Sequence, residues 1–326
     1  MRYVDEFRRT KDIIKAAAAI KGIMPRGRIN IMEVCGTHTQ SFYRFGLGKM
    51  LPATLRLIAG PGCPVCVSTQ EYIDAAIELA GIPDVVVLSF GDMLRVPGSR
   101  STLEKERARS GRIQVVYSPL DSIALAKLYP QKRIVFLAVG FETTAATFAL
   151  TLAQAKKEQL NNLFFFASLK LIPPAMEYLL QDKRLNVQGF LCPGHVSAII
   201  GARAYAFIVK KYKTACCVAG FDPLDILEGI YLLLQQIVRK RPRVANQYQR
   251  VVSCQGNSRA QLIMKQVFEV SDASWRGLGR IARSGLEIRK SYSAFDAQRE
   301  FSLLAPKTKK ISLCRCGDVL KGLIGP

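Results

Sequence analysis

The run Val85-Val86-Val87-Leu88-Ser89-Phe90 decides the fold, because it is apolar at nearly every position. A strand that is buried on both faces of a parallel sheet has this pattern, whereas a strand with one solvated face alternates. Similar runs occur at 29–34, 54–59, 113–117, 133–139, 163–168, 187–192 and 216–220. Helical patterns separate them, among others at 5–20, 39–48, 119–128, 174–181, 197–210 and 224–239. Strands that alternate with helices predict an α/β fold with parallel sheets and right-handed crossovers.

A chain of 326 residues can bury the cores of two domains. We expect a first α/β domain over residues 1–130, completed by 250–300, and a second over 131–249. A small C-terminal, cysteine-containing region follows at 301–326. Within residues 250–300, the pattern predicts a helix at 257–269 and then an irregular, glycine-rich segment in which Trp275 is a packing anchor.

Composition limits the class of protein. Hydrophobic residues make up 49% and charged residues 22%, as in soluble globular proteins. The first residues are charged, and no apolar run reaches membrane-spanning length without a charge, Gly or Pro. We therefore expect a cytoplasmic protein with no membrane segment.

The nine cysteines also suit a reducing compartment with catalytic or metal-binding thiols, because their number is odd and their spacing uneven. Four of them lie in or beside apolar runs and are predicted to be small core residues: Cys192, Cys216, Cys217 and Cys254.

The formal net charge is +22, with basic clusters at 239–241, 276–289 and 307–310. Such an excess can mark nucleic-acid binding, but no zinc finger, RNP motif or recognition helix accompanies it. A basic solvated surface, or a docking face for acidic partners, explains the charge better.

The loop GPGCPVC at 60–66 carries the most specific chemistry. Its Gly-Pro-Gly lead fixes a tight turn, and its C-x-x-C spacing allows a disulfide, a shared metal, or one thiol that resolves another. Ser68 and Glu71 form a capping-box pattern, which places Cys66 just ahead of a helix N-terminus that favours its thiolate. A structural zinc half-site or two inert thiols remain possible, but this setting favours Cys63 and Cys66 as reactive thiols.

The loop CGTH at 35–38 places a thiol and an imidazole three residues apart. Both are good ligands for iron or zinc, and His38 could instead keep Cys35 ionised or simply pack. The only other histidine, His195, also follows a strand-like run in a glycine-containing loop, PGHVS at 193–197. Because ligands bind at the carboxyl ends of parallel strands, these loops could face one crevice.

Two acidic residues follow predicted strands. Asp92 lies in a loop with Arg95, so a surface ion pair and a binding role are both open. Glu142 begins a predicted helix and could be a general base, a carboxylate near a metal, or an acid that the helix dipole favours. At the tail, Cys314 and Cys316 could begin an iron–sulfur or zinc site, which needs about four thiolates.

Taken together, these motifs resemble one family. EVCGTH at 33–38, GPGCPVC at 60–66, FGDMLRVPGS at 90–99, GFETT at 140–144, PGHVS at 193–197 and WRGLG at 275–279 occur in the order found in the HypD family. HypD proteins mature nickel–iron hydrogenases. The resemblance runs from about Asp5 to the end of the chain.

The resemblance implies two similar α/β domains that flank a cleft, plus a small cluster domain. It implies a scaffold and redox assembly protein, rather than a conventional turnover enzyme, that works with HypC to build the Fe(CN)2CO group of the hydrogenase active site. Cyanide comes from HypE, which receives it through HypF. The iron lies between HypC and the residue matching Cys35, and the thiols matching Cys63 and Cys66 form a redox pair linked to a [4Fe–4S] cluster. His38, Asp92, Glu142 and His195 match motif positions near the cleft.

The sequence departs from the family pattern in three places. Gln40 replaces a second histidine, and Asp222 stands where relatives often have Glu. Relatives continue past the position of Pro326 with the cysteines that complete the cluster, so we expect either a truncated sequence or a lost cluster. The alternative function is a thiol–disulfide oxidoreductase that carries no iron, and such an enzyme would not need the CGTH loop.

Overall fold

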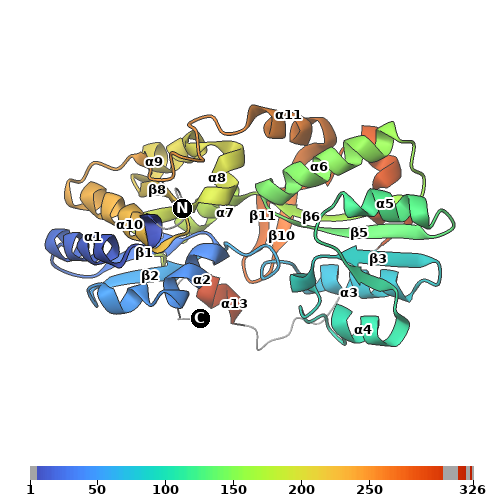
Figure 1. Ribbon diagram of the computed structural model, residues 1–326, viewed down its shortest axis with the longest axis horizontal. Helices are drawn as coiled ribbons and strands as arrows, with labels where there is room; N and C mark the ends of the chain where they lie inside the picture. The colour runs from blue at the N-terminus through green and yellow to red at the C-terminus, as the bar shows by residue number, and fades with distance from the viewer. Residues whose placement is uncertain (1–5, 304–314, 321–323, 325–326) are drawn as a thin grey trace. The chain divides into compact units, whose positions relative to one another are not determined.

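The computed structural model describes residues 6–303, 315–320 and 324, and the chain forms two compact units. The five-stranded unit comprises Met1–Cys63, Ala175–Ser258 and Cys316–Pro326, and the six-stranded unit comprises Pro64–Pro174 and Arg259–Arg315. This division differs from the predicted boundaries of 1–130 and 131–249. The reason is that strand pairing in a parallel sheet is not local, so early strands can join late ones (Figure 1).

The sheet of the five-stranded unit has the order β2-β1-β7-β8-β9, and every pair in it is parallel. Its strands are β1 (Ile29–Glu33), β2 (Leu55–Ala59), β7 (Gly189–Pro193), β8 (Ala215–Ala219) and β9 (Val244–Asn246). Buried side chains occupy every position of β1, β7 and β8. That pattern confirms the expectation of strands covered on both faces.

Helices cover this sheet. The apolar sides of α1 (Thr10–Ile23) and α10 (Pro223–Val238) form one core with Ile31, Leu191 and Cys217 of the sheet. The remaining helical elements of the unit are η1 (Glu6–Arg8), α2 (Gly36–Arg44), η2 (Leu47–Met50), α7 (Ile172–Leu180), α8 (Gly194–Ile200), η4 (Ala202–Tyr205), α9 (Ala206–Tyr212) and α13 (Cys316–Leu320), of which α7 begins three residues before the unit boundary.

The sheet of the six-stranded unit has the order β10-β11-β6-β5-β3-β4. Its parallel strands are β3 (Val85–Ser89), β4 (Ile113–Val115), β5 (Arg133–Gly140) and β6 (Leu163–Lys170). The helical elements are α3 (Gln70–Gly81), η3 (Gly91–Met93), α4 (Leu103–Ser110), α5 (Asp121–Leu128), α6 (Glu142–Lys157), α11 (Ser258–Val267), η5 (Lys290–Phe295) and α12 (Ala297–Glu300).

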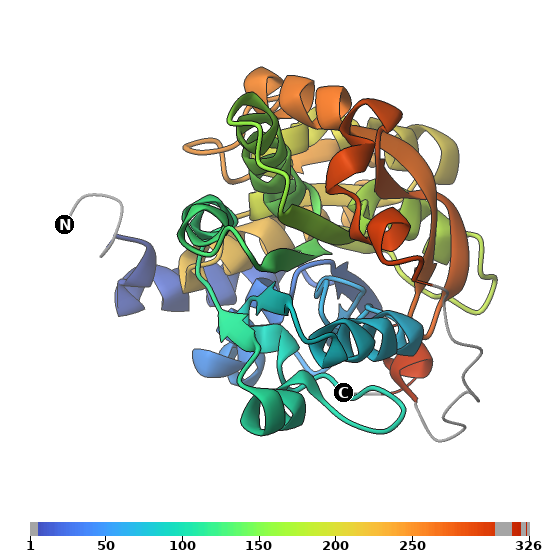
Figure 2. The ribbon, with the colours of Figure 1, turned by 90° about the vertical axis from the view of Figure 1, so that its right-hand side faces the viewer.

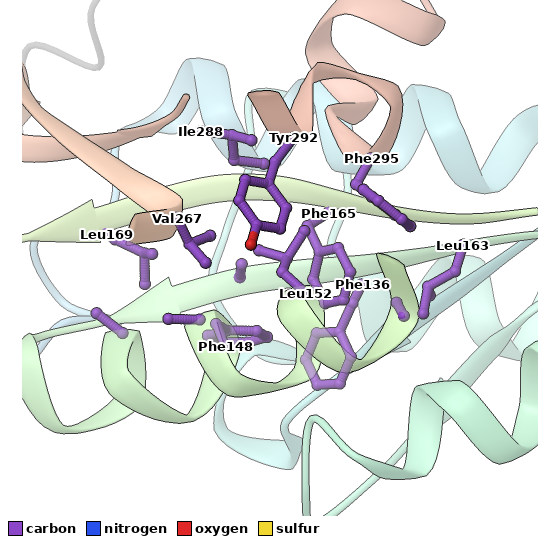
Figure 3. Packing of buried hydrophobic residues seen from close by; sticks show 14 of the residues in the cluster. Phe136, Phe148, Leu152, Leu163, Phe165, Leu169, Val267, Ile288, Tyr292 and Phe295 are labelled. Carbon is purple, nitrogen blue, oxygen red and sulfur yellow. The ribbon is translucent and has the colours of Figure 1, made fainter. Parts of the chain in front are cut away.

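Alternate residues of β6 face different helices. Phe165 joins Phe136 and Phe148 in the aromatic core under α6 (Figure 3). The next residue, Phe166, stacks instead on Tyr72 of α3 at a ring separation of 4.4 Å. Both faces of the sheet are therefore packed, and these five phenylalanine and tyrosine rings contribute much of the buried apolar area.

A hairpin replaces the irregular segment that the sequence suggested near Trp275. Strands β10 (Phe268–Trp275) and β11 (Gly279–Ile288) pair antiparallel, and β11 adds to the edge of β6 (Figures 1 and 2). Gly277 and Gly279 adopt φ of 81° and 85°, which gives the turn its left-handed backbone. Trp275 is 1% exposed, so its predicted role as a packing anchor is confirmed.

The α/β fold with two parallel-dominated sheets is as predicted, and the buried cysteines Cys192, Cys216 and Cys217 confirm most of the core prediction. Cys254 contradicts it. This residue is exposed, because the chain leaves the core after Val252 and turns through a polar segment. None of the helices in the described ranges is both long and apolar enough to cross a membrane.

Candidate functional site

The loops that follow the five parallel strands of the five-stranded unit lie at one edge of its sheet. This carboxyl edge carries Cys35 after β1, Cys63 after β2 and His195 after β7. Phe221 follows β8, and Tyr248 follows β9. Parallel strands end side by side, so residues more than 200 positions apart in the sequence gather here.

Cys35 is the N-cap residue of α2 and is 9% exposed. Its carbonyl oxygen accepts hydrogen bonds from the amides of His38 and Thr39 at 3.0 and 3.3 Å, which starts the helix at this residue. Burial raises the pKa of the Cys35 thiol, and interactions with Thr37 and the backbone of His38 oppose that shift. The sulfur therefore lies at a helix N-terminus that stabilises a thiolate, but in a dry setting.

The loop after β2 packs directly on the Cys35 loop. The amide of Gly36 donates to the carbonyl of Gly62 at 3.0 Å, and the amide of Gly60 donates to Glu33 at 2.8 Å. A Cβ atom on Gly62 would lie 2.2 Å from the Cys35 nitrogen, and a Cβ on Gly36 would lie 3.7 Å from the Cβ of Cys63. The Gly-Pro-Gly lead is thus needed for close approach of two backbones, which brings Cys63 beside the Cys35 loop.

His38 is fully buried and its orientation is fixed. Its Nε2 lies 3.2 Å from the carbonyl oxygen of Ala219 and 2.9 Å from that of Gly220. Carbonyl oxygens only accept, so Nε2 carries the proton and Nδ1 carries the lone pair. Nδ1 has no hydrogen-bond partner among the described residues. Burial lowers the pKa of His38 to about 4, so the imidazole is neutral near pH 7.

The two histidines of the chain meet at one aromatic ring. His195 stacks on Phe221 at a centroid distance of 4.0 Å, and His38 lies 4.9 Å from the same ring. His195 is exposed on its other side, and its partial burial lowers its pKa. The structure therefore unites the two histidine loops that the sequence singled out.

A polar network that the sequence analysis missed holds the His38 acceptors in place. Asp225 is fully buried, and both its oxygens accept from Arg250, at 2.8 and 2.6 Å. Gln247 donates to Asp225 and accepts from the amide of Gly220 at 3.1 Å. Charge-assisted and bidentate bonds of this kind are strong, so they fix the carbonyl of Gly220 against His38.

Glu33 is a second group that the sequence analysis did not assign. It ends β1, two residues before Cys35, and is 3% exposed. Burial raises its pKa to about 7, and the side chain of Thr39 opposes that shift. One signal was available: an acidic residue ends a mostly apolar strand two positions before a cysteine.

The C-x-x-C pair spans a turn that starts before α3. Cys63 is half-buried and Cys66 is exposed. The predicted cap at Ser68 is wrong by one residue, because Thr69 is the N-cap and its hydroxyl accepts from the amide of Tyr72. Ser68 is buried instead and donates to the carbonyl of Pro64 at 2.9 Å, which closes the turn that contains Cys66.

Glu142 lies in the six-stranded unit, at the start of α6 after β5. It is 2% exposed, and its Oε1 accepts from the amide of Ile172 at 3.0 Å. Its Oε2 has no hydrogen-bond partner in the described part of the chain. Burial raises its pKa to about 7. The carboxyl group therefore joins the starts of α6 and α7, where it can hold or release a proton near neutral pH.

Lys170 ends β6 at the same edge of this sheet, and the sequence analysis missed it. It is 3% exposed, and its Nζ donates to the hydroxyl of Ser168 at 2.8 Å. The ring of Trp275 lies 5.9 Å away, held by a bond from its Nε1 to Ser284 at 2.8 Å. Burial lowers the pKa of Lys170 to about 8.

Asp92 lies in η3 of the six-stranded unit and is exposed. Of the two alternatives left open, the structure does not show the surface pair with Arg95: Arg95 contacts Glu104 at 3.5 Å, and both of those side chains are exposed. Asp92 therefore presents its carboxylate to solvent after β3.

Comparison with known proteins agrees with the motif series. A family model described as HypD, hydrogenase formation hypA family, matches residues 11–326. The chain belongs to the HypD family. It is 40% identical over 333 residues to the hydrogenase maturation factor HypD of Escherichia coli K12, across 100% of this chain and 89% of that protein. The HypD of Azotobacter vinelandii is 40% identical over 334 residues, across 100% of this chain and 88% of the relative. The hydrogenase expression/formation protein HupD of Azotobacter chroococcum is 41% identical, with the same coverage.

The HypD motifs divide between the two units. CGTH and PGHVS belong to the five-stranded unit, whereas FGDMLRVPGS, GFETT and WRGLG belong to the six-stranded unit. The GPGCPVC loop contains the crossing between the units, after Cys63. Among the described side chains, no group of three or more His, Cys, Asp or Glu is placed to hold a metal ion. Of the two predicted cluster ligands, Cys314 lies outside the described residues, and Cys316 begins α13 without a described side chain.

Proposed function

We propose that this chain holds the iron fragment of a nickel–iron hydrogenase active site while cyanide and carbonyl ligands are attached to it. The observation that carries the proposal is the position of Cys35, a buried thiol at the N-terminus of α2, on the sheet edge where His38 and His195 meet at Phe221. A soft thiolate suits low-spin iron with cyanide and carbonyl ligands, because electron-rich sulfur supports back-donation to them.

The surroundings of Cys35 fit a thiolate ligand. The N-terminus of α2 offers its amides to the negative sulfur, and the dry setting excludes competing water. In this proposal the thiol loses its proton as the sulfur–iron bond forms. His38 acts as a positioning residue, because its bonds to the carbonyls of Ala219 and Gly220 fix the first turn of α2 and hence Cys35. His195, exposed at the same edge, exchanges protons with the cargo.

Cys63 and Cys66 act as a dithiol–disulfide couple. Forming the disulfide releases two electrons and two protons, which a reductive ligand assembly consumes. Exposure of Cys66 suits attack by a partner thiolate on the sulfur of Cys66 in the disulfide, with Cys63 as the leaving thiolate. Cys63 lies beside the Cys35 loop. In the six-stranded unit, Glu142 positions α7 and buffers a proton, and Asp92 offers an exposed carboxylate to a partner or to cargo.

The partners proposed are those that the family resemblance implies. HypC shares the iron through its own cysteine, and HypE donates cyanide that it receives through HypF. A [4Fe–4S] cluster would have Cys314 and Cys316 among its ligands and would supply electron-transfer chemistry, but these two thiolates are fewer than the about four that such a cluster needs.

The second candidate is a thiol–disulfide oxidoreductase without iron cargo. The exposed Cys66 on a rigid turn favours it. The two functions differ in Cys35, which an oxidoreductase does not use. Loss of function in Cys63→Ser with full function in Cys35→Ser would select the oxidoreductase.

Complementation tests the proposal. The chain is produced in a bacterium whose own HypD gene is deleted, and hydrogen-dependent dye reduction is measured. Cys35→Ser and Cys63→Ser should fall to the background of the deletion strain, whereas the matched control Cys254→Ser should keep the parent activity because this exposed thiol has no role in the proposal. Parent-level activity in Cys35→Ser at equal protein abundance would refute the proposal.

A further inference from the structure

The amino-terminal edge of the five-stranded sheet is strongly basic. The segments that lead into β1, β7, β8 and β9 are 21–28, 181–188, 210–214 and 239–243. They contain twelve Lys and Arg and one acid, Asp182. The basic residues, all exposed, are Lys21, Arg26, Arg28, Lys183, Arg184, Lys210, Lys211, Lys213, Arg239, Lys240, Arg241 and Arg243.

Topology gathers these charges into one surface, which we call the basic edge. The four strands are parallel neighbours, in the order β1-β7-β8-β9, so their amino ends lie side by side at spacings of about 4.8 Å. The segments carry a net charge of +11, half of the formal +22 of the chain. The basic edge is at the opposite ends of the strands from Cys35 and His195.

Few acids offset this charge. Within the residues that the structure describes, Arg184 forms an ion pair with Asp182 at 2.6 Å, and Lys211 forms one with Glu177 at 2.8 Å. The other ten basic residues of the basic edge form no ion pair with a described residue. Asp318 also acts electrostatically on Arg184. Uncompensated like charges repel one another, so such a cluster costs stability unless a partner uses it.

The fold itself does not require a basic edge. Lys and Arg near helix C-termini each stabilise the helix only weakly through its dipole. The same edge of the six-stranded sheet, at 81–84, 110–112, 129–132 and 158–162, has two basic and two acidic residues. Its acids are paired, Asp84 with Arg133 at 2.9 Å and Glu158 with Lys127 at 2.8 Å.

We propose that the basic edge is a docking surface for an acidic protein, one that presents a cluster of carboxylates. Single-stranded nucleic acids need exposed aromatic rings for stacking, but Tyr212 is the only aromatic residue in the four segments, and it is half-buried and donates to Glu177 at 3.0 Å. Membrane binding needs large apolar side chains to insert, and Val238 is the one such exposed residue next to these segments. Long, separate Lys and Arg side chains suit carboxylates, and the docked partner would leave the carboxyl edge open for chemistry.

The test uses poly-L-glutamate as the probe and the full chain as the protein. Fluorescence anisotropy measures binding of the labelled polymer to the parent and to a variant with Arg239, Lys240, Arg241 and Arg243 all changed to Glu. The matched control changes Arg100, Lys105, Arg107 and Lys157 to Glu, four exposed basic residues of the six-stranded unit, so that net charge falls equally. We expect the first variant to weaken binding about tenfold or more and the control about threefold or less, since contacts at the docking surface exceed the long-range field. Equal weakening in both variants would overturn the proposal.

Two further arms complete the test. A 20-nucleotide DNA duplex, a single-stranded RNA of the same length and phosphatidylglycerol vesicles replace the polymer at the same salt concentration. Tighter binding of any of them than of poly-L-glutamate would overturn the choice of an acidic protein. Changing Arg239, Lys240, Arg241 and Arg243 to Gln provides a milder variant, which removes the positive charges without adding negative ones. Its unfolding midpoint should match or exceed that of the parent, while its binding of poly-L-glutamate still falls.

Discussion

The carboxyl edges of the two sheets differ in the functional side chains that they bring together. In the five-stranded unit, a thiol and two imidazoles gather at Cys35, His38 and His195. In the six-stranded unit, the corresponding residues are a buried carboxyl group and a buried amine, Glu142 and Lys170. A parallel sheet thus fixes where functional side chains gather, and the residues after each strand decide the chemistry. The first edge suits a soft metal fragment, and the second suits proton exchange near neutral pH.

The amino edges differ as well. That of the five-stranded unit is basic, whereas that of the six-stranded unit is balanced by ion pairs such as Asp84–Arg133. Half of the net charge of the chain therefore lies at one end of one sheet, so it is a local property and not a feature of the architecture.

The largest effect is expected from a substitution that disrupts the carboxyl edge of the five-stranded unit. In Gly62→Ala the new Cβ would lie 2.2–2.5 Å from backbone atoms of Cys35 and Val34, which cannot move cheaply. We expect a loss of about 3 kcal/mol or more in the free energy of unfolding, or a displaced Cys35 loop. Urea unfolding and the rate of Cys35 alkylation measure these outcomes.

Gly22→Ala is the control, because nothing lies within 4 Å of its Cβ position in α1. It should stabilise the chain by up to about 0.5–1 kcal/mol, since Ala has a higher helix propensity than Gly. If Gly62→Ala were as mild as this control, the close packing of the two cysteine loops would be wrong.

The next effect concerns the buried amine. The folded pKa of Lys170 is about 8, below its ordinary value, so between pH 8 and 10.5 the unfolded chain holds a proton that the folded chain has lost. Stability from this group therefore rises with pH in that window. We expect Lys170→Met to raise the free energy of unfolding by up to about 3 kcal/mol at pH 7, and the gain to shrink toward pH 10. A variant that is less stable than the parent at both pH values would contradict this prediction. It would show that interactions in the folded chain offset the cost of burying the Lys170 amine.

The smallest of the three effects concerns the buried acid. The folded pKa of Glu142 is about 7, above its ordinary value, so the folded chain keeps a proton between pH 4.5 and 7 that the unfolded chain has released. Stability from this group is present below pH 4.5 and is lost as pH rises through 7. Glu142→Gln keeps an acceptor for the amide of Ile172, and we expect it to gain about 2 kcal/mol at pH 8 and almost nothing at pH 4. If the difference in the free energy of unfolding between the variant and the parent did not change with pH, the raised pKa of Glu142 would be contradicted.

Most of the strands could be predicted from the sequence, because a continuous apolar run is a local signal. The runs at 85–90 and 133–139 became β3 (Val85–Ser89) and β5 (Arg133–Gly140). Pairing is not local, so the sequence could not reveal that β1 joins β7. The hairpin near Trp275 was missed because its exposed alternate residues and glycines resemble a loop.

The candidate site was predictable only in part. Cysteines and histidines are rare enough to stand out in loops, so Cys35, His38 and His195 were singled out. Burial of common charged residues depends on the tertiary fold, so nothing local marked Lys170 or the Asp225–Arg250 pair. Cys254 was predicted to be buried but is exposed, since an apolar neighbour in the sequence does not ensure a buried thiol.

The most direct test of the central claim, that the thiol at the carboxyl edge of the five-stranded unit holds the iron fragment, is an infrared measurement. The chain is purified without oxygen from cells that also produce HypC, HypE and HypF, and iron content is determined together with the cyanide and carbonyl stretching region. We predict cyanide and carbonyl bands and bound iron in the parent and in Cys254→Ser, and neither in Cys35→Ala at equal HypC binding. Undiminished bands in Cys35→Ala would contradict the account.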